Sequence, residues 1–241
     1  MTPVLTIDGP GGAGKGTVCM RIAAAMGWHL LDSGALYRLV GLAARKQGVE
    51  PDDAAAVPAL AEALDVRFEV DRDATCVTTL LDGEVVNEAL RTEQAGNDAS
   101  RAAAIPAVRN ALLQRQRDFA VPPGLVADGR DMGTVVFPEA DLKIFLDASA
   151  AERARRRQLQ LLEQGLSANL DDLREEMEER DRRDRKRSVA PLKPAEDAWV
   201  LDTTDLDIVT VVDLILERLR DVLPEDRPPA DETPGSGIEN T

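Results

Sequence analysis

The residues whose spacing most clearly indicates chemistry form a glycine-rich loop near the start of the chain. Glycine lets backbone N–H groups approach phosphate oxygens closely, and a helix that begins at the loop adds partial positive charge. Lys15 adds a full charge that can reach the β and γ phosphates of a nucleotide. We therefore expect phosphates to bind along the whole loop, which comprises Gly9, Pro10, Gly11, Gly12, Ala13, Gly14, Lys15, Gly16 and Thr17.

The loop departs at one position from the usual form of this motif. That form places Ser or Thr directly after the lysine, where the hydroxyl can bind Mg²⁺. Here Gly16 follows Lys15, and Thr17 comes one position later. Thr17 is therefore the candidate metal ligand, with a phosphate as the alternative partner of its hydroxyl.

The composition excludes several other classes of protein. Among 241 residues, 29 Lys and Arg stand against 44 Asp and Glu, and the net charge of −15 argues against a surface that binds nucleic acid or a membrane. Four Phe, two Trp and one Tyr are too few for a base-stacking platform. The single histidine, His29, and the two cysteines exclude a multi-histidine metal site and a disulfide scaffold. With neither an export signal nor a membrane-spanning run in view, we expect a cytoplasmic protein.

The elements that must position the loop alternate between short apolar strands and helical patterns, which is typical of an α/β protein with a parallel sheet. Strands are expected at residues 4–7, 28–31, 125–127, 143–146 and 199–201. Helices are expected at residues 15–26, between Ser33 as N-cap and Gly48, from Pro106 onward, and at 208–222. Residues 66–70 and 76–86 predict an antiparallel insert with a two-residue turn at Asp82-Gly83.

Four further motifs connect the loop to a known family. They are LDSGALYR at residues 31–38, DGRDMGTVVFP at 128–138, ERDRRDR at 179–185 and APL at 190–192. Together with GKGT in the loop, they resemble bacterial cytidylate kinases, which are P-loop nucleoside monophosphate kinases. The resemblance extends from about Val4 to Leu223. It implies a three-layer α/β/α core around a five-stranded parallel sheet, a small antiparallel β lobe for the monophosphate, and an arginine-rich lid.

The resemblance also implies an activity and a domain organisation. The activity is transfer of the γ-phosphoryl group of ATP to CMP or dCMP with Mg²⁺, in a protein that we expect to be a monomer. The core would comprise residues 1–32, 105–163 and 198–223, the CMP lobe 33–104 and the lid 164–197. The proline-rich acidic segment 224–241 is predicted to be disordered.

By motif position, the resemblance assigns a CMP-binding set. The residues around the cytosine would be Ser33, Ser100, Arg109 and Asp131. Those that bind the acceptor phosphate would be Arg38, Arg130 and Arg187, and those on the sugar side Arg180 and Asp184. The candidate catalytic residues are Lys15, Arg130 and Arg187. Ser100 and Arg109 rest on weaker local patterns than the others.

The chemistry of these residue types agrees with such a reaction. A monophosphate is mostly a dianion at neutral pH, so its transfer needs cations and positioning rather than a histidine base. Arginine suits an acceptor phosphate because its planar fork binds two oxygens at once. Asp131 can accept a hydrogen bond from the N4 amine of cytosine, whereas uracil would place a carbonyl against the carboxylate.

Structural alternatives remain open for several of these residues. Asp131 could cap its own loop, and Ser33 could serve only as an N-cap. Asp128 could order the waters of Mg²⁺ or hold the turn at Arg130. Residues 178–187 could form an exposed salt-bridged helix, although Arg180, Asp184 and Arg187 would share one helical stripe that can close over nucleotides.

Two other functions also remain possible at this stage. One is a different small-molecule kinase on the same core, acting on UMP or on an alcohol. The other is a nucleotide-dependent switch or binding protein, although the chain contains no Asn-Lys-x-Asp segment for guanine.

Overall fold

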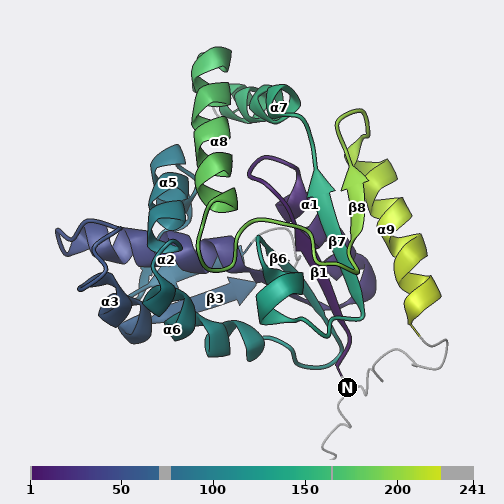
Figure 1. Ribbon diagram of the computed structural model, residues 1–241, viewed down its shortest axis with the longest axis horizontal. Helices are drawn as coiled ribbons and strands as arrows, with labels where there is room; N and C mark the ends of the chain where they lie inside the picture. The colour runs from purple at the N-terminus through teal and green to yellow at the C-terminus, as the bar shows by residue number, and fades with distance from the viewer. Residues whose placement is uncertain (1, 71–76, 164, 224–241) are drawn as a thin grey trace, which may run out of the picture.

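The chain forms a parallel sheet with helices on both faces (Figure 1). The structure is a computed structural model that describes residues 2–70, 77–163 and 165–223. The predicted acidic tail at 224–241 and Cys76 lie outside the described residues.

Five parallel strands, in the order β2-β6-β1-β7-β8, make up the central sheet of the described part of the chain. Their bounds are Val4–Asp8 (β1), His29–Asp32 (β2), Leu125–Gly129 (β6), Leu142–Asp147 (β7) and Trp199–Asp202 (β8). All residues of β1 and β6 are buried, as expected for strands covered on both faces. The prediction of a five-stranded parallel sheet is confirmed, with each strand within about two residues of its expected position.

One face of the sheet is covered by α1 (Lys15–Met26) and α9 (Ile208–Val222), whose apolar residues share one core with β1 and β7. Both helices begin and end where the sequence predicts. Gly27 ends α1 in the left-handed conformation, with φ 63°, and two amides of that turn bond back to Ala23 and Ala24. The Asp207 carboxylate caps α9 by accepting a hydrogen bond from the Thr210 amide at 2.8 Å.

The opposite face is covered by α2 (Ser33–Lys46) and α6 (Pro106–Arg117). The prediction that Ser33 is the N-cap of α2 is wrong. Asp32 is the N-cap, and its carboxylate accepts a hydrogen bond from the Ala35 amide at 2.9 Å. Ser33 is the first helical residue, so its hydroxyl is free of the capping role.

The residues between α2 and α6 build a small lobe. It contains α3 (Val57–Ala63), the antiparallel strands β3 (Val66–Val70), β4 (Val77–Leu81) and β5 (Glu84–Val85), then α4 (Asn87–Leu90) and α5 (Glu93–Ala102). The predicted turn is confirmed, because Asp82 and Gly83 both have positive φ, 53° and 79°, as a type I′ hairpin requires. Helix α5 packs against α2 and so attaches this lobe to a helix that covers the sheet.

Two charged helices stand beyond the carboxyl ends of the strands (Figure 1). They are α7 (Ala150–Glu163) and α8 (Leu170–Arg185), which pack against each other. Helix α8 also contacts α5 of the small lobe. None of the helices in the described residues is both long and apolar enough to cross a membrane.

Candidate active site

A cavity of about 650 Å³ opens at the carboxyl edge of the sheet, between the loop after β1, the small lobe and α8. This is the position where open α/β sheets bind ligands. The cavity lining includes all nine predicted CMP-binding residues: Ser33, Arg38, Ser100, Arg109, Arg130, Asp131, Arg180, Asp184 and Arg187. It also includes the loop from Gly11 to Thr17. Gly9 and Pro10 are buried at the exit of β1 and are not part of the lining.

The phosphate loop has the backbone that the glycines were expected to permit. Gly12 and Gly14 have φ values of 79° and 90°, which side-chain-bearing residues rarely adopt. Gly14 is the N-cap of α1 and has no side chain. No N-cap carboxylate therefore bonds the first amides of α1. Such a helix start attracts an anion.

Lys15 lies beneath this loop with only 6% of its surface exposed. Its Nζ donates a hydrogen bond to the Pro10 carbonyl at 3.0 Å and lies 3.7 Å from Oδ1 of Asp128. Burial, followed by the charge of Arg130, lowers the pKa of Lys15 to about 8. The cation therefore lies in a site that a phosphate would complete electrostatically. The Asp128 carboxylate faces Lys15.

Asp184 is the centre of a group of charged side chains on the acceptor side. It is 1% exposed, accepts a hydrogen bond from the Ser100 hydroxyl at 2.7 Å and from Nε of Arg130 at 3.2 Å, and forms an ion pair with Arg187. Burial acts to raise the pKa of Asp184, but Arg187, Arg130 and Arg180 hold it below its ordinary value. One ionised carboxylate thus orients two guanidinium groups.

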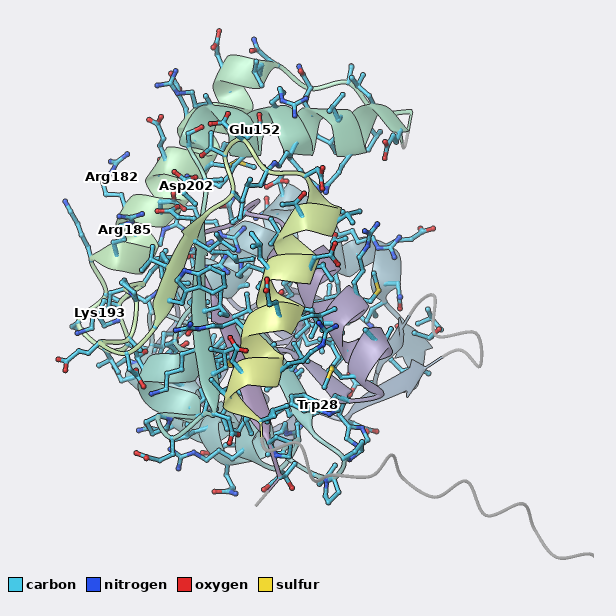
Figure 2. All side chains as sticks on the ribbon, turned by 90° about the vertical axis from the view of Figure 1, so that its right-hand side faces the viewer. Trp28, Glu152, Arg182, Arg185, Lys193 and Asp202 are labelled. Carbon is cyan, nitrogen blue, oxygen red and sulfur yellow. The ribbon has the colours of Figure 1, made fainter. Side chains whose placement is uncertain are left out.

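The prediction that Arg180, Asp184 and Arg187 share one helical stripe is wrong for Arg187. Arg180 and Asp184 lie on α8, but the helix ends at Arg185 and Arg187 follows it. Arg187 nevertheless forms an ion pair with Asp184. Figure 2 shows Arg182 and Arg185 on the outer side of α8, which marks the solvated face of this charged helix.

Arg180 points the other way, into the cavity. A Cβ on Gly96 of α5 would lie 2.8 Å from its Nη1, and a Cβ on Gly11 of the phosphate loop would lie 3.6 Å from the same atom. The guanidinium therefore lies between the loop and the small lobe. Burial and then the charge of Arg130 lower the pKa of Arg180 to about 10. This position does not fit the alternative of an exposed salt-bridged residue.

The residues predicted to surround a base also come together. Arg109 and Asp131 form a buried ion pair, and the Arg109 guanidinium lies 5.5 Å from the centre of the Tyr37 ring. Asp131 is the N-cap of a single π-helical turn, η1 (Met132–Val136), yet its side chain makes no capping bond. The carboxylate is directed to Arg109 instead, so the loop-capping alternative for Asp131 is not supported. Ser33 is 3% exposed at the same end of the cavity.

Sequence reasoning did not select Arg153 from among the four arginines at the start of α7. The structure singles it out. Its Nη1 donates to the Gly11 carbonyl at 2.9 Å and its Nη2 to Asp181 of α8 at 2.5 Å. Arg153 therefore joins the phosphate loop to α8. Nothing in the local pattern could distinguish it from Arg155, which pairs with Glu152 on the exposed face.

The site also fits a metal ion that arrives with a nucleotide. Within the described residues, no group of three or more His, Cys, Asp or Glu side chains could hold a metal ion. Thr17 lines the cavity and is exposed, and a Cβ on Gly16 would lie 3.6 Å from Oδ2 of Asp128. A hydroxyl and one carboxylate suit Mg²⁺, which keeps most of its waters and is commonly bound through substrate phosphates.

Comparisons with known proteins agree with this geometry. Residues 5–221 match the family model described as cytidylate kinase. A curated cytidylate kinase of Aeromonas hydrophila subsp. hydrophila is 58% identical over 226 residues, covering 92% of this chain and 97% of the relative. That of Stutzerimonas stutzeri is 58% identical over 219 residues, covering 91% and 96%. That of Aeromonas salmonicida is 57% identical over 216 residues, covering 90% and 93%.

Proposed function

This chain belongs to the cytidylate kinase family, and from that premise we propose how its residues carry out phosphoryl transfer from ATP to CMP. The enzyme phosphorylates CMP with ATP, giving CDP and ADP. The observation that carries the proposal is the meeting of a phosphate loop and four arginines in one cavity. The arginines are Arg38, Arg130, Arg180 and Arg187.

We propose that ATP lies along residues 9–17, with its outer phosphates at Lys15 and the start of α1. Arg38, Arg130 and Arg187 bind the phosphate of CMP or dCMP in front of it. The transferring group is then surrounded by cations, which stabilise the charge spread over its oxygens in the transition state. The acceptor dianion attacks directly, and no side chain is needed as a base.

The organisation of the cations supports this assignment. Asp184 holds Arg130 and Arg187 before the substrate arrives, so little reorganisation is needed during transfer. Arg180 and Asp184 are assigned to the sugar side, and Ser100, whose hydroxyl bonds Asp184, is assigned to the cytosine. Lid closure through α8 would exclude water, which otherwise competes as the acceptor.

Base selection is assigned to the buried pair of Asp131 and Arg109, with Ser33 beside it. Cytosine presents the N4 amine as a donor next to the acceptors N3 and O2. A carboxylate can accept from N4 while the guanidinium donates to N3 or O2. UMP would place its O4 against Asp131, leaving polar groups unpaired.

Mg²⁺ is the metal that we propose, bound through the ATP phosphates with Thr17 as its protein contact and Asp128 reaching its waters. When bound, it would neutralise developing charge on the phosphates. We further propose the division into core, lobe and lid given above. We also propose that the protein is a cytoplasmic monomer.

An acceptor panel tests the proposal. Coupled ADP-release rates are measured with CMP, dCMP, UMP and AMP, for the wild type and for Asp131→Asn. We expect kcat/KM to be highest for the cytidine nucleotides, and Asp131→Asn to erode that preference while KM for ATP stays within twofold. A higher kcat/KM for UMP than for CMP would refute the assignment. Slow ATP hydrolysis indifferent to CMP would favour a nucleotide-dependent switch.

A further inference from the structure

Asp8, the last residue of β1, is a buried carboxylate that the transfer reaction does not use. It is 4% exposed and directly precedes the phosphate loop. Its Oδ1 accepts a hydrogen bond from the Met132 amide and its Oδ2 from the Gly133 amide, both at 2.8 Å. The two strand-end segments thus joined are far apart in the sequence, because the bonded residues are 124 and 125 positions apart.

Those two amides are the first of η1, which begins at Met132. Amides at the start of a helix have no partner within the helix, and the side chain of the N-cap residue normally bonds the second or third of them, here that of Gly133 or Thr134. The N-cap residue of η1 is Asp131, whose type is well suited to that role. Its carboxylate is paired with Arg109 instead.

We propose that Asp8 is a positioning residue for base selection: it caps η1 from the neighbouring strand and so leaves the Asp131 carboxylate free to face Arg109 and the cytosine. This inference rests on the role proposed above for Asp131. Asp8 contacts no substrate atom. It acts by fixing the position of the backbone at Asp131.

The packing around η1 supports this close attachment to β1. A Cβ on Gly133 would lie 2.9 Å from Oγ1 of Thr6 and 3.2 Å from Cδ of Lys143, so only glycine lets this amide come so near the strand. The other end of η1 is held as well. Arg117 donates hydrogen bonds to the carbonyls of Val136 at 3.0 Å and Val135 at 3.2 Å.

The ionised form of Asp8 is disfavoured by its surroundings. Burial raises the pKa of Asp8 to about 7, although the amides of Gly133 and Met132 act to lower it, and the nearby charge of Asp131 raises it further. Lys15 is the cation that opposes this effect. A carboxylate whose ionisation costs folding free energy is placed where stability alone would favour a neutral group.

The test compares Asp8→Asn with a matched control. Asparagine keeps the shape but has one acceptor, so one of the two η1 amides loses its partner. The control is Asp141→Asn, because Oδ2 of Asp141 accepts a hydrogen bond from the Val4 amide at 2.8 Å, at the other end of the same strand. For each protein, kcat/KM is measured with CMP and UMP at pH 8, along with KM for ATP.

We expect Asp8→Asn to lower the CMP-to-UMP ratio of kcat/KM by about tenfold, the loss expected for one hydrogen bond to a charged group. KM for ATP should stay within twofold. Asp141→Asn should leave the ratio unchanged. A ratio unchanged in Asp8→Asn, or lowered equally in Asp141→Asn, would overturn the inference, because a purely structural role would not alter selectivity between two bases.

A double variant separates this inference from the role of Asp131. In an Asp131→Asn background, Asp8→Asn should reduce the ratio no further, since Asp8 acts through Asp131. An additional loss would overturn the inference. If Asp131→Asn alone leaves the ratio unchanged, the proposed role of Asp131 fails and this inference fails with it. If Asp131→Asn lowers the ratio and Asp8→Asn does not, only the inference about Asp8 fails.

A second variant disturbs the same contact from the other side. Gly133→Ala places a methyl group against Thr6 and should push the Gly133 amide away from Asp8. It serves as the test if Asp8→Asn does not fold. The same selective fall in the CMP-to-UMP ratio is expected, and an unchanged ratio would overturn the inference.

Discussion

Replacing Lys15 with methionine should abolish most activity and yet make the ligand-free protein more stable. Lys15 is 6% exposed, and burial lowers its pKa to about 8, so its charge costs folding free energy at neutral pH. Methionine has a similar length and no charge. Transfer should slow by at least about a hundredfold, because a cation that stabilises the transferring group is lost.

The magnitude follows from the pKa of Lys15. The difference between the ordinary value of 10.5 and about 8 corresponds to about 3 kcal/mol, at about 1.4 kcal/mol per pKa unit. Removing Lys15 also deprives Asp128 of its partner at 3.7 Å and loses the hydrogen bond to Pro10. These losses offset part of the gain. We therefore expect the free energy of unfolding of Lys15→Met to exceed that of the wild type by about 1–3 kcal/mol.

The gain should depend on pH in a defined direction. Below about pH 8, Lys15 is charged in both the folded and the unfolded protein, and the full penalty applies. Between about 8 and 10.5 the unfolded chain binds more protons, so the stability of the wild type rises with pH. The advantage of Lys15→Met over the wild type should therefore shrink between pH 7 and pH 10.

Urea unfolding at both pH values measures these differences, with Lys143→Met as the control. Lys143 is also buried, at 8% exposed, but its Nζ bonds the Pro138 carbonyl at 2.5 Å and both oxygens of Asp197 at 2.8 and 3.0 Å. Its removal should destabilise the protein by about 1–2 kcal/mol. A stability of Lys15→Met below that of the wild type at pH 7 would refute the reasoning that burying the Lys15 charge costs more free energy than its contacts return.

Three further predictions concern the acceptor side, the lid and the metal. Asp184→Asn should raise KM for CMP at least tenfold and lower the free energy of unfolding by about 3–5 kcal/mol, because buried guanidinium groups lose their charged partner. Initial rates and urea unfolding measure these two effects, and an unchanged KM for CMP would contradict the prediction. Arg153→Met should raise KM for ATP about tenfold by breaking the charge-assisted bonds of its guanidinium to Ala148, Gly11 and Asp181. Arg174→Met, on the exposed face of α8, should not raise it, and equal effects on KM would count against the link between the phosphate loop and α8. Chelation with EDTA should stop turnover without changing the Tm of the ligand-free protein, as no cluster of metal-ligating side chains occurs in the described residues, and a fall in Tm would reveal a structural metal.

Local patterns were sufficient to predict much of the architecture. Apolar strands buried on both faces, the glycines of the phosphate loop and the bounds of α9 are properties of short segments, and the structure agrees with each. The Asp82-Gly83 turn belongs to the same group, because positive φ at both residues is a local requirement. Ser33 shows the limit of such reasoning. Asp32 and Ser33 are both good N-cap types, and the backbone decides for Asp32.

The sequence by itself therefore determined the order of the elements, the phosphate loop and the set of charged residues near it. Only the tertiary structure decided which groups the charged side chains contact. Ser100 and Asp184 are 84 residues apart in the chain, Arg153 and Gly11 are 142 apart, and Asp8 and Met132 are 124 apart. No local periodicity links such partners, because side-chain ion pairs and capping bonds depend on where the sheet order and helix packing place each strand end, and those are properties of the whole folded chain.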